Sequence, residues 1–146
     1  MSKAIDIEST LAQVPLFSEL NRRALGRLTR GAVSRRFGKG DIIVKEGEQA
    51  VAFFFILSGR VEVVKGAEGP TPKVLNTLSP GDFFGETALL DSYLRSATVR
   101  ALEDTECLEL WRWDFLYALR TNRHIALEML PVLGRRLRET DEQLAT

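Results

Sequence analysis

The sequence is poor in several residues on which common kinds of functional site depend. It contains one cysteine, Cys107, and one histidine, His124. A single cysteine cannot form an internal disulfide, and without a second histidine or a cysteine cluster the usual side chains cannot assemble a zinc site. No pairing of a general base with a nucleophile stands out either. The sequence therefore predicts a protein that is not an enzyme and that carries no metal or other cofactor.

The sequence also lacks an excess of charge of one sign and a long apolar run. Twenty Lys and Arg balance twenty Asp and Glu, so no global positive field attracts nucleic acid or an anionic membrane. No stretch approaches the roughly 20 apolar residues needed to cross a bilayer, and the N-terminal MSKAIDIEST lacks the apolar run of a signal peptide. These absences predict a cytoplasmic protein with no membrane segment.

The length of the chain and its apolar content suit one domain. With 146 residues, 45% of them hydrophobic, the chain can bury one sizeable core but is short for two ordinary domains. Two short helices are predicted within residues 1–30, where apolar residues recur at helical spacing on either side of Pro15. Ser18 or Asn21 is a possible N-cap of the second helix. We expect one domain covering residues 1–146.

Residues 32–111 predict a β-roll. Short runs rich in β-branched and aromatic residues are separated by Gly, Pro, Asp or Ser, and seven or eight strands at this spacing are typical of a roll or barrel. The runs are AVSRRF, DIIV, AFFFIL, RVEVV, KVLNTL, SATVRAL and ECLELW. Two of them are joined by Ser58-Gly59, which predicts a hairpin because glycine supplies the positive φ of a tight turn. Phe53, Phe54 and Phe55 are expected in the core.

After Trp111 the apolar spacing is helical again, and residues 113–144 predict a short helix followed by a long one. The long helix repeats residues at alternating spacings of four and three, as at the a and d positions of a coiled coil. These residues are Ala126, Leu130, Leu133, Leu137, Thr140 and Leu144. Such a seam predicts a partner helix and therefore a homodimer, and Pro131 within it predicts a kink.

The segment SPGDFFGETALLDSYLRSATV, residues 79–99, is unlike a core strand because two glycines bracket two aromatics and an acid and a base follow. A loop that begins at Gly85 and turns into one helical turn presents unpaired backbone N–H groups, which suit an anion. Arg95 carries a forked guanidinium that can donate two hydrogen bonds to one phosphate. Glu86 is an acceptor and can receive a hydrogen bond from a ribose hydroxyl. Together these residues favour a sugar phosphate.

This spacing resembles the phosphate-binding cassette of the cyclic-nucleotide-binding domain family, whose pattern is Phe-Gly-Glu-x-Ala-Leu, a short spacer, and Arg-Ser/Ala-Ala-Thr-Val. It stands here as Phe84-Gly85-Glu86-Thr87-Ala88-Leu89 and Arg95-Ser96-Ala97-Thr98-Val99. The resemblance extends to PLFSEL, to ILSGRVEVV and to the two closing helices. It implies an α+β, mainly β fold: an eight-stranded β-roll or jelly-roll barrel with short N-terminal helices, a cassette at 84–97 and two C-terminal helices.

The same resemblance implies a role for each residue of the cassette. Gly85 permits close approach, Glu86 accepts the free 2′-hydroxyl, and Arg95 neutralises the cyclic phosphate. Ser96 and the backbone amides near Ala88 and Ala97 complete the cradle. The closing helix looks like the dimer helix of bacterial catabolite activator-type regulators, which implies that Thr140 contacts the adenine base. Leu94 departs from kinase-type members, which have proline before the arginine, so this loop is less rigidly preset.

Each of these residues also has a plainer interpretation. Arg95 could be a surface arginine opposite a carboxylate, and Glu86 could cap a turn. Ser96 could be satisfied by the backbone, and Thr140 could fix the register of a coiled coil.

The resemblance therefore implies a sensor that binds cAMP, with cGMP second, and that signals through its C-terminal helices to an effector which the sequence does not identify. The alternative is a dimerisation or protein-interaction module that has the same fold but binds no ligand. Because the sequence stops at Thr146, directly after the predicted dimer helix, we expect no DNA binding by this chain itself.

Overall fold

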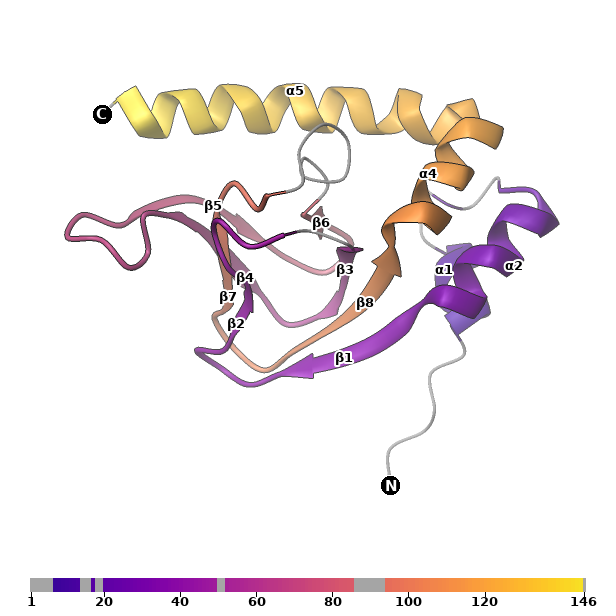
Figure 1. Ribbon diagram of the computed structural model, residues 1–146, viewed down its shortest axis with the longest axis horizontal. Coiled ribbons are helices and arrows are strands. Elements are labelled where there is room, and N and C mark those ends of the chain that lie inside the picture. Colours follow the sequence, from indigo (N-terminus) through magenta and orange to yellow (C-terminus); the bar gives the residue numbers. More distant parts are fainter. Residues whose placement is uncertain (1–6, 14–16, 18–19, 50–51, 86–93, 146) are drawn as a thin grey trace.

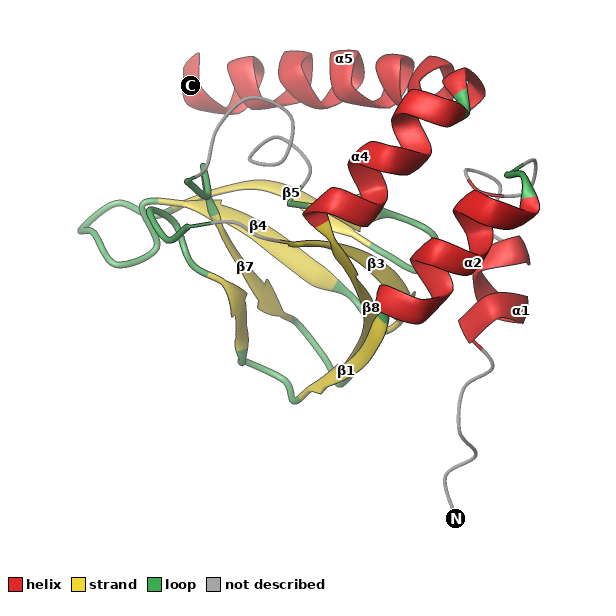
Figure 2. Cartoon of the chain, turned by 45° about the vertical axis from the view of Figure 1, so that its right-hand side comes forward, coloured by secondary structure: helices red, strands yellow, loops and turns green. Residues whose placement is uncertain are grey.

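The computed structural model of the chain describes residues 7–13, 17, 20–49, 52–85 and 94–145. These residues form two four-stranded antiparallel sheets with helices on the N-terminal and C-terminal sides (Figures 1 and 2), which confirms the predicted β-roll. The strands are β1 (Val33–Phe37), β2 (Ile42–Val44), β3 (Ala52–Ser58), β4 (Val61–Lys65), β5 (Lys73–Leu78), β6 (Phe83–Phe84), β7 (Thr98–Ala101) and β8 (Thr105–Trp111). The helices are α1 (Ile7–Gln13), α2 (Arg22–Gly31), α4 (Arg112–Thr121) and α5 (Arg123–Ala145).

The predicted helices at the N-terminal side are present, and the second begins with a side-chain cap. The Asn21 side chain accepts a hydrogen bond from the backbone N–H of Ala24 at 2.8 Å, which satisfies one of the free donors at the start of α2. Ala24 and Leu28, four residues apart, lie on the buried face of this helix. Asn21, one of the two residues predicted for this position, is therefore the N-cap.

The predicted hairpin at Ser58-Gly59 is wrong. Strand β3 pairs with β6 and β8 in one sheet, while β4 pairs with β5 and β7 in the other. Gly59 does have the positive φ expected of a tight turn, +90°, but this turn carries the chain from one sheet to the other. Two apolar runs and a glycine indicate a turn; they do not indicate whether the second run pairs with the first or crosses to the opposite sheet.

Strand β3 separates two hydrophobic clusters because successive side chains of a strand point to opposite faces. Phe53 and Phe55 lie in the cluster under the helices, together with Leu11, Phe17, Leu28, Leu108, Leu110, Phe115, Ile125 and Met129. Phe54 and Ile56 lie in the cluster inside the roll, together with Val44, Val61, Leu78, Phe84, Val99 and Cys107. All three phenylalanines are buried, as predicted.

Helix α5 runs along the open side of the roll, from α4 to the far end of β5 (Figure 1). It is one helix of 23 residues that continues through Pro131. At its start, the Asn122 side chain accepts a hydrogen bond from the backbone N–H of Asn21 at 3.4 Å. At its far end, Lys73 Nζ donates to the carbonyl oxygen of Gln143 at 2.9 Å, and Asn76 Nδ2 donates to Glu139 Oε2 at 3.2 Å.

Among the residues described, none of the helices combines the length and the apolar character that a membrane span requires.

Candidate functional site

A cavity of about 460 Å³ lies between the inner face of the roll and α5, a volume within the range of small-molecule sites. Its walls are mostly apolar side chains from five strands and α5, and a few polar and charged side chains reach it. The strand and loop residues are Val44, Val63, Lys65, Leu75, Asn76, Leu78, Phe84, Gly85, Arg95, Ser96, Ala97 and Val99; α5 contributes Leu133, Arg136, Leu137 and Thr140.

Arg95 is the buried cation of this cavity, with 9% of its surface exposed. Its Nη2 donates to the carbonyl oxygen of Ala52 at 2.8 Å, and its Nη1 donates to the carbonyl oxygen of Gly85 at 3.2 Å. Its backbone exchanges hydrogen bonds with the turn at 47–48, since Arg95 N donates to Glu48 O and Gly47 N donates to Arg95 O. The plainer interpretation of Arg95 as a surface arginine is therefore wrong.

Gly85 permits a close approach, and in this structure the approaching group is Arg95. Its φ is +86°, a region that favours glycine. A Cβ at this position would lie 2.5 Å from Arg95 Nη1, so the guanidinium would have to move to make room for it. The family resemblance implies a close approach at Gly85, and that role toward a ligand stays a prediction. The contact that the structure describes is with the Arg95 guanidinium, which packs beside β6.

Ser96 and Ala97 lie beside Arg95 at the start of β7, and both line the cavity. The carbonyl oxygen of Ser96 accepts a hydrogen bond from Lys65 Nζ at 2.8 Å, so a cation from β4 holds this loop. Lys65 also pairs with Glu46 Oε2 at 3.4 Å. The backbone N–H of Gly66, and to a lesser degree the Lys65 charge, lower the pKa of the Glu46 carboxyl below its ordinary value, so these polar groups form one network beside the cavity.

Thr140 reaches the cavity from α5, as predicted for a residue that contacts a ligand from that helix. It is half-buried and lies one turn from Arg136, whose guanidinium stands 4.5 Å from the centre of the Phe83 ring. Leu133 also lines the cavity. In contrast, Leu127, Leu130 and Leu137 are 61 to 64% exposed. Of the predicted seam, Leu133, Leu137 and Thr140 therefore line the cavity, although Leu137 is also largely exposed, while Leu130 is exposed and outside the cavity lining.

Four residues of the predicted site, Glu86, Thr87, Ala88 and Leu89, lie outside the described residues. Their roles stay predictions. Phe84 is described: it is 2% exposed, and its ring stacks on that of Phe54 with 5.1 Å between centroids, so it supports the wall of the cavity.

Several cavity residues were not predicted from the sequence, among them Val63, Lys65, Leu75 and Asn76. They come from β4 and β5, far from the cassette in the chain. The alternation of side chains along these two strands was the available signal, but using it requires knowing which face of each strand is turned toward the inside of the roll.

A comparison with protein families matches residues 34–122 to the cyclic nucleotide-binding domain. This match covers more than half of the chain and includes the strands that build the cavity together with Gly85, Arg95, Ser96 and Ala97. The chain belongs to the cyclic nucleotide-binding domain family.

Relatives within this family include bacterial and fungal regulators. The chain is 38% identical to the cyclic AMP receptor protein of Thermus thermophilus over 110 residues. This aligned region is 75% of this chain and 51% of that protein. It is 44% identical over 96 residues to the cAMP-dependent protein kinase regulatory subunit of Debaryomyces hansenii, which covers 66% of this chain and 20% of that protein. The chain thus spans about half of the first relative and a fifth of the second.

Among solved structures, the chain is similar to the catabolite activator protein of Thermus thermophilus. The two share 35% sequence identity with a TM-score of 0.72, over 90% of this chain and 62% of the other.

Proposed function

We propose that this chain is the sensor part of a regulatory protein, which binds a cyclic nucleoside monophosphate in the cavity and performs no catalysis. One observation carries the proposal: a buried arginine, the cassette residues beside it and a hydroxyl from α5 meet at a single cavity. The names of the Thermus and Debaryomyces relatives support cAMP as the ligand, with cGMP second.

The chemistry of Arg95 suits a cyclic phosphate. A cyclic phosphate diester carries one negative charge, which one guanidinium can match with two parallel hydrogen bonds. The carbonyl oxygens of Ala52 and Gly85 now accept these donors. Because Arg95 can give the same N–H groups to a phosphate, it can exchange neutral acceptors for a charged one. Ser96, Ala97 and the N–H groups predicted near Ala88 would share the phosphate, and Glu86 would accept the 2′-hydroxyl.

The signal is proposed to leave through the C-terminal helices. Thr140 and Arg136 belong to α5 but line the cavity, so a ligand that touches them binds one position of α5 better than another. The joint between α4 and α5 is at Asn122, whose backbone N–H donates to the carbonyl oxygen of Ala118. A ligand would thereby shift the population of α5 positions that an effector can recognise.

Calorimetric titration with cAMP and cGMP tests the site, using the wild type, Arg95→Ala and Arg95→Lys. We expect binding in the micromolar range and a loss of about 100-fold in Arg95→Ala, since two charge-assisted hydrogen bonds are removed. Arg95→Lys keeps the charge but not the fork and should lie between the two.

Arg60→Ala is the matched control, because this arginine is 55% exposed, pairs with Glu103 and is outside the cavity. The proposal fails if the wild type shows neither heat nor a thermal shift with either nucleotide, or if Arg95→Ala, verified as folded from its unfolding curve, binds as well as Arg60→Ala. The alternative of a module that binds no ligand would then be the better account.

We further propose that α5 pairs with α5 of a second copy. Leu127 and Leu130, one helix turn apart, leave an apolar edge on its outer side, away from the cavity. Light scattering should show a dimer for the wild type and a monomer for Leu127→Glu/Leu130→Glu. The control Val33→Glu/Val74→Glu replaces two exposed valines of the roll and should stay dimeric. A wild-type monomer at high concentration, with and without nucleotide, contradicts this assembly.

A further inference from the structure

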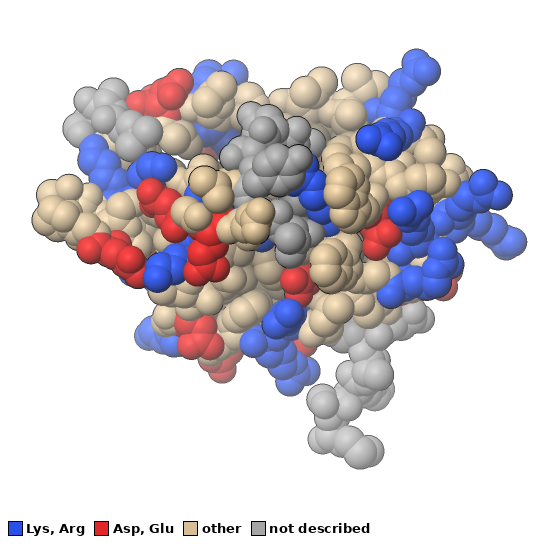
Figure 3. Space-filling view, in the orientation of Figure 1, with Lys and Arg blue, Asp and Glu red and all other residues tan. Residues whose placement is uncertain are grey.

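The charges of this chain are unevenly distributed although their sum is zero. Segments 20–31 and 111–124, which contain α2 and α4, carry seven arginines and one acidic residue, Asp114. Figure 3 shows basic side chains gathered at the end of the molecule where these helices lie. Asp114 is paired with Arg27 at 2.9 Å. Within the described part of the chain, no acidic side chain pairs with Arg23, Arg30, Arg120 or Arg123.

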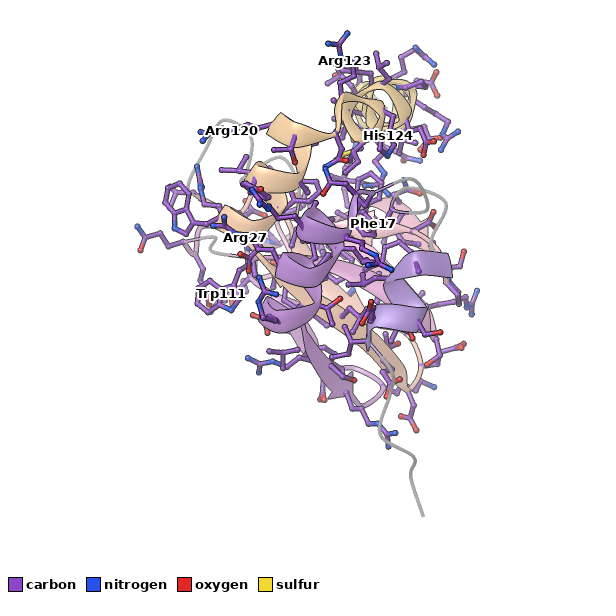
Figure 4. All side chains as sticks on the ribbon, turned by 90° about the vertical axis from the view of Figure 1, so that its right-hand side faces the viewer. Phe17, Arg27, Trp111, Arg120, Arg123 and His124 are labelled. Carbon is purple, nitrogen blue, oxygen red and sulfur yellow. The ribbon has the colours of Figure 1, made fainter. Side chains whose placement is uncertain are left out.

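These arginines are aligned on the outer sides of two neighbouring helices. Arg23 and Arg30 are seven residues apart on α2, so they lie on one face, away from the buried Ala24 and Leu28. On α4, Trp113 and Arg120 have the same spacing and lie away from the buried Phe115 and Ala118. Because α2 and α4 pack against each other, the two faces form one surface. Figure 4 shows Arg27, Trp111 and Arg120 along one side of this pair.

Two tryptophans give this surface an apolar component. Trp111 is 49% exposed and Trp113 is 64% exposed, and they are the only tryptophans in the chain. The guanidinium of Arg112 stands 5.6 Å from the Trp113 ring centre. Tryptophan and arginine are among the residue types that are enriched where a few side chains contribute most of the binding energy of a protein interface.

We propose that the surface formed by Arg23, Arg30, Trp111, Trp113 and Arg120, here called the arginine-tryptophan face, binds an acidic segment of another polypeptide. Each guanidinium can donate two hydrogen bonds to one carboxylate of the segment, and the tryptophan rings can pack against the apolar side chains of the segment.

The charge of the rest of the molecule favours a short acidic segment over nucleic acid or a membrane. Proteins that bind such extended polyanions carry a basic excess over the domain, whereas this chain has a sequence pI of about 6.6. Because the net charge of the chain is zero and the two helical segments are basic, the rest of the chain is acidic. It therefore repels a polyanion that extends beyond the arginine-tryptophan face. A short acidic segment meets only the arginines and tryptophans.

The tryptophans themselves report binding, because the chain has no others. Their fluorescence should be titrated with a short synthetic peptide that repeats Glu-Glu-Leu, and in parallel with single-stranded DNA and with vesicles of phosphatidylserine and phosphatidylcholine. We expect saturable binding of the peptide with a blue shift of the emission, weakened by salt because exposed charges are screened. The variant Trp113→Phe should keep part of this signal from Trp111.

Charge reversal localises the binding. Arg23→Glu/Arg120→Glu, with one change on each helix, should weaken the peptide by about tenfold or more, since each change replaces an attraction with a repulsion. Arg135→Glu/Arg138→Glu is the matched control: it makes the same change of charge at two exposed arginines of α5, and we expect binding within about twofold of the wild type.

Three results overturn the proposal: no saturable change with the peptide, an equal loss in the two charge-reversal variants, or tighter binding of DNA or vesicles than of the peptide. Since none of these measurements involves a nucleotide, their failure is distinct from failure of the proposed sensor function.

Discussion

The two faces of β3 have different surroundings. Phe53 and Phe55 pack against helices, with 4.1 Å between the ring centres of Phe53 and Phe115. Phe54 and Ile56 face the roll, whose packed interior gives way to a cavity toward α5. One side of the strand therefore lies in a filled core and the other lies next to a space. The difference separates stability from binding: a filled core holds the fold, and a space bounded by a fixed wall is free to accept a ligand.

Removing a ring from the filled core should have the largest effect on stability. Phe53 is fully buried between Phe83 and Phe115, so Phe53→Ala should lower the free energy of unfolding by about 3–5 kcal/mol, measured by urea denaturation. Val63→Ala is the comparison on the cavity side, where the half-buried side chain already lacks partners on one side, and should cost about 1 kcal/mol. Equal losses would contradict the distinction between the two regions.

The turn that joins the two sheets should be next in size. Gly59→Ala combines a positive φ with a Cβ that would lie 2.5 Å from Asp104 O and 2.7 Å from Thr105 Cα. It should lower the free energy of unfolding by about 2–4 kcal/mol.

Gly81→Ala is the control for the backbone strain alone. Gly81 has a similar φ, +94°, but nothing lies within 4 Å of its added Cβ, so this change should cost only about 1 kcal/mol. If Gly59→Ala lowers the free energy of unfolding no more than Gly81→Ala does in the same thermal or urea experiment, the close packing of Gly59 against residues 104–105 does not contribute to stability.

On the cavity side, a change that spares the fold should alter binding. Thr140→Val removes a hydroxyl from the half-buried edge of α5 and keeps the shape of the side chain. If this hydroxyl bonds the base, cAMP binding measured by calorimetry should weaken by about threefold to tenfold, the value of one hydrogen bond, with an unchanged melting temperature. Thr77→Val, at an exposed threonine of β5 outside the cavity, is the control. Wild-type affinity in Thr140→Val would leave Thr140 with only a role in packing.

The smallest effect concerns the thiol inside the roll. Burial, and then the charge of Glu106, raise the pKa of Cys107 from 9.0 to about 12. In the unfolded chain the thiol ionises near its ordinary pKa while in the folded chain it stays protonated, so its contribution to stability is complete below pH 9 and decreases as the pH rises toward 12. When the pH is raised from about 8 to about 10, the melting temperature should decrease less for Cys107→Ala than for the wild type. The same slope in both would contradict this assignment.

The fold was predicted well where the sequence pattern is local. Three features depend only on neighbours in sequence: the beginning of α2 at Asn21, the alternation along the strands, and the return to helical spacing after Trp111. Pairing across the sheets depends on distant segments, and the one pairing predicted from a local turn, at Ser58-Gly59, was wrong. The two-residue strand β6 was not among the predicted runs because Phe83 and Phe84 stand between glycines, which favour a loop.

The site divides in the same way. Gly85, Arg95, Ser96 and Ala97 belong to one short motif of two segments, and the structure brings these four residues to the cavity. Lys65 holds the carbonyl oxygen of Ser96 from a strand some thirty residues away, and no local pattern indicates such a contact. For the seam of α5, the spacing identified the residues, but only packing shows that Leu133 is turned to the cavity and Leu130 to solvent.

Because α5 is long, a small rotation at its joint with α4, at Asn122, displaces its far end by a large distance. At 1.5 Å per residue, the 23 residues of this helix extend about 35 Å, so a rotation of about 10° at the joint displaces the far end by about 6 Å. Such a displacement exceeds the reach of a hydrogen bond. It would release Gln143 from Lys73 and Glu139 from Asn76, while Ile125, one turn from the pivot, moves less than the diameter of a methyl group. In the proposed signalling, α5 would therefore act as a lever whose distal contacts separate while the residues next to Asn122 move little.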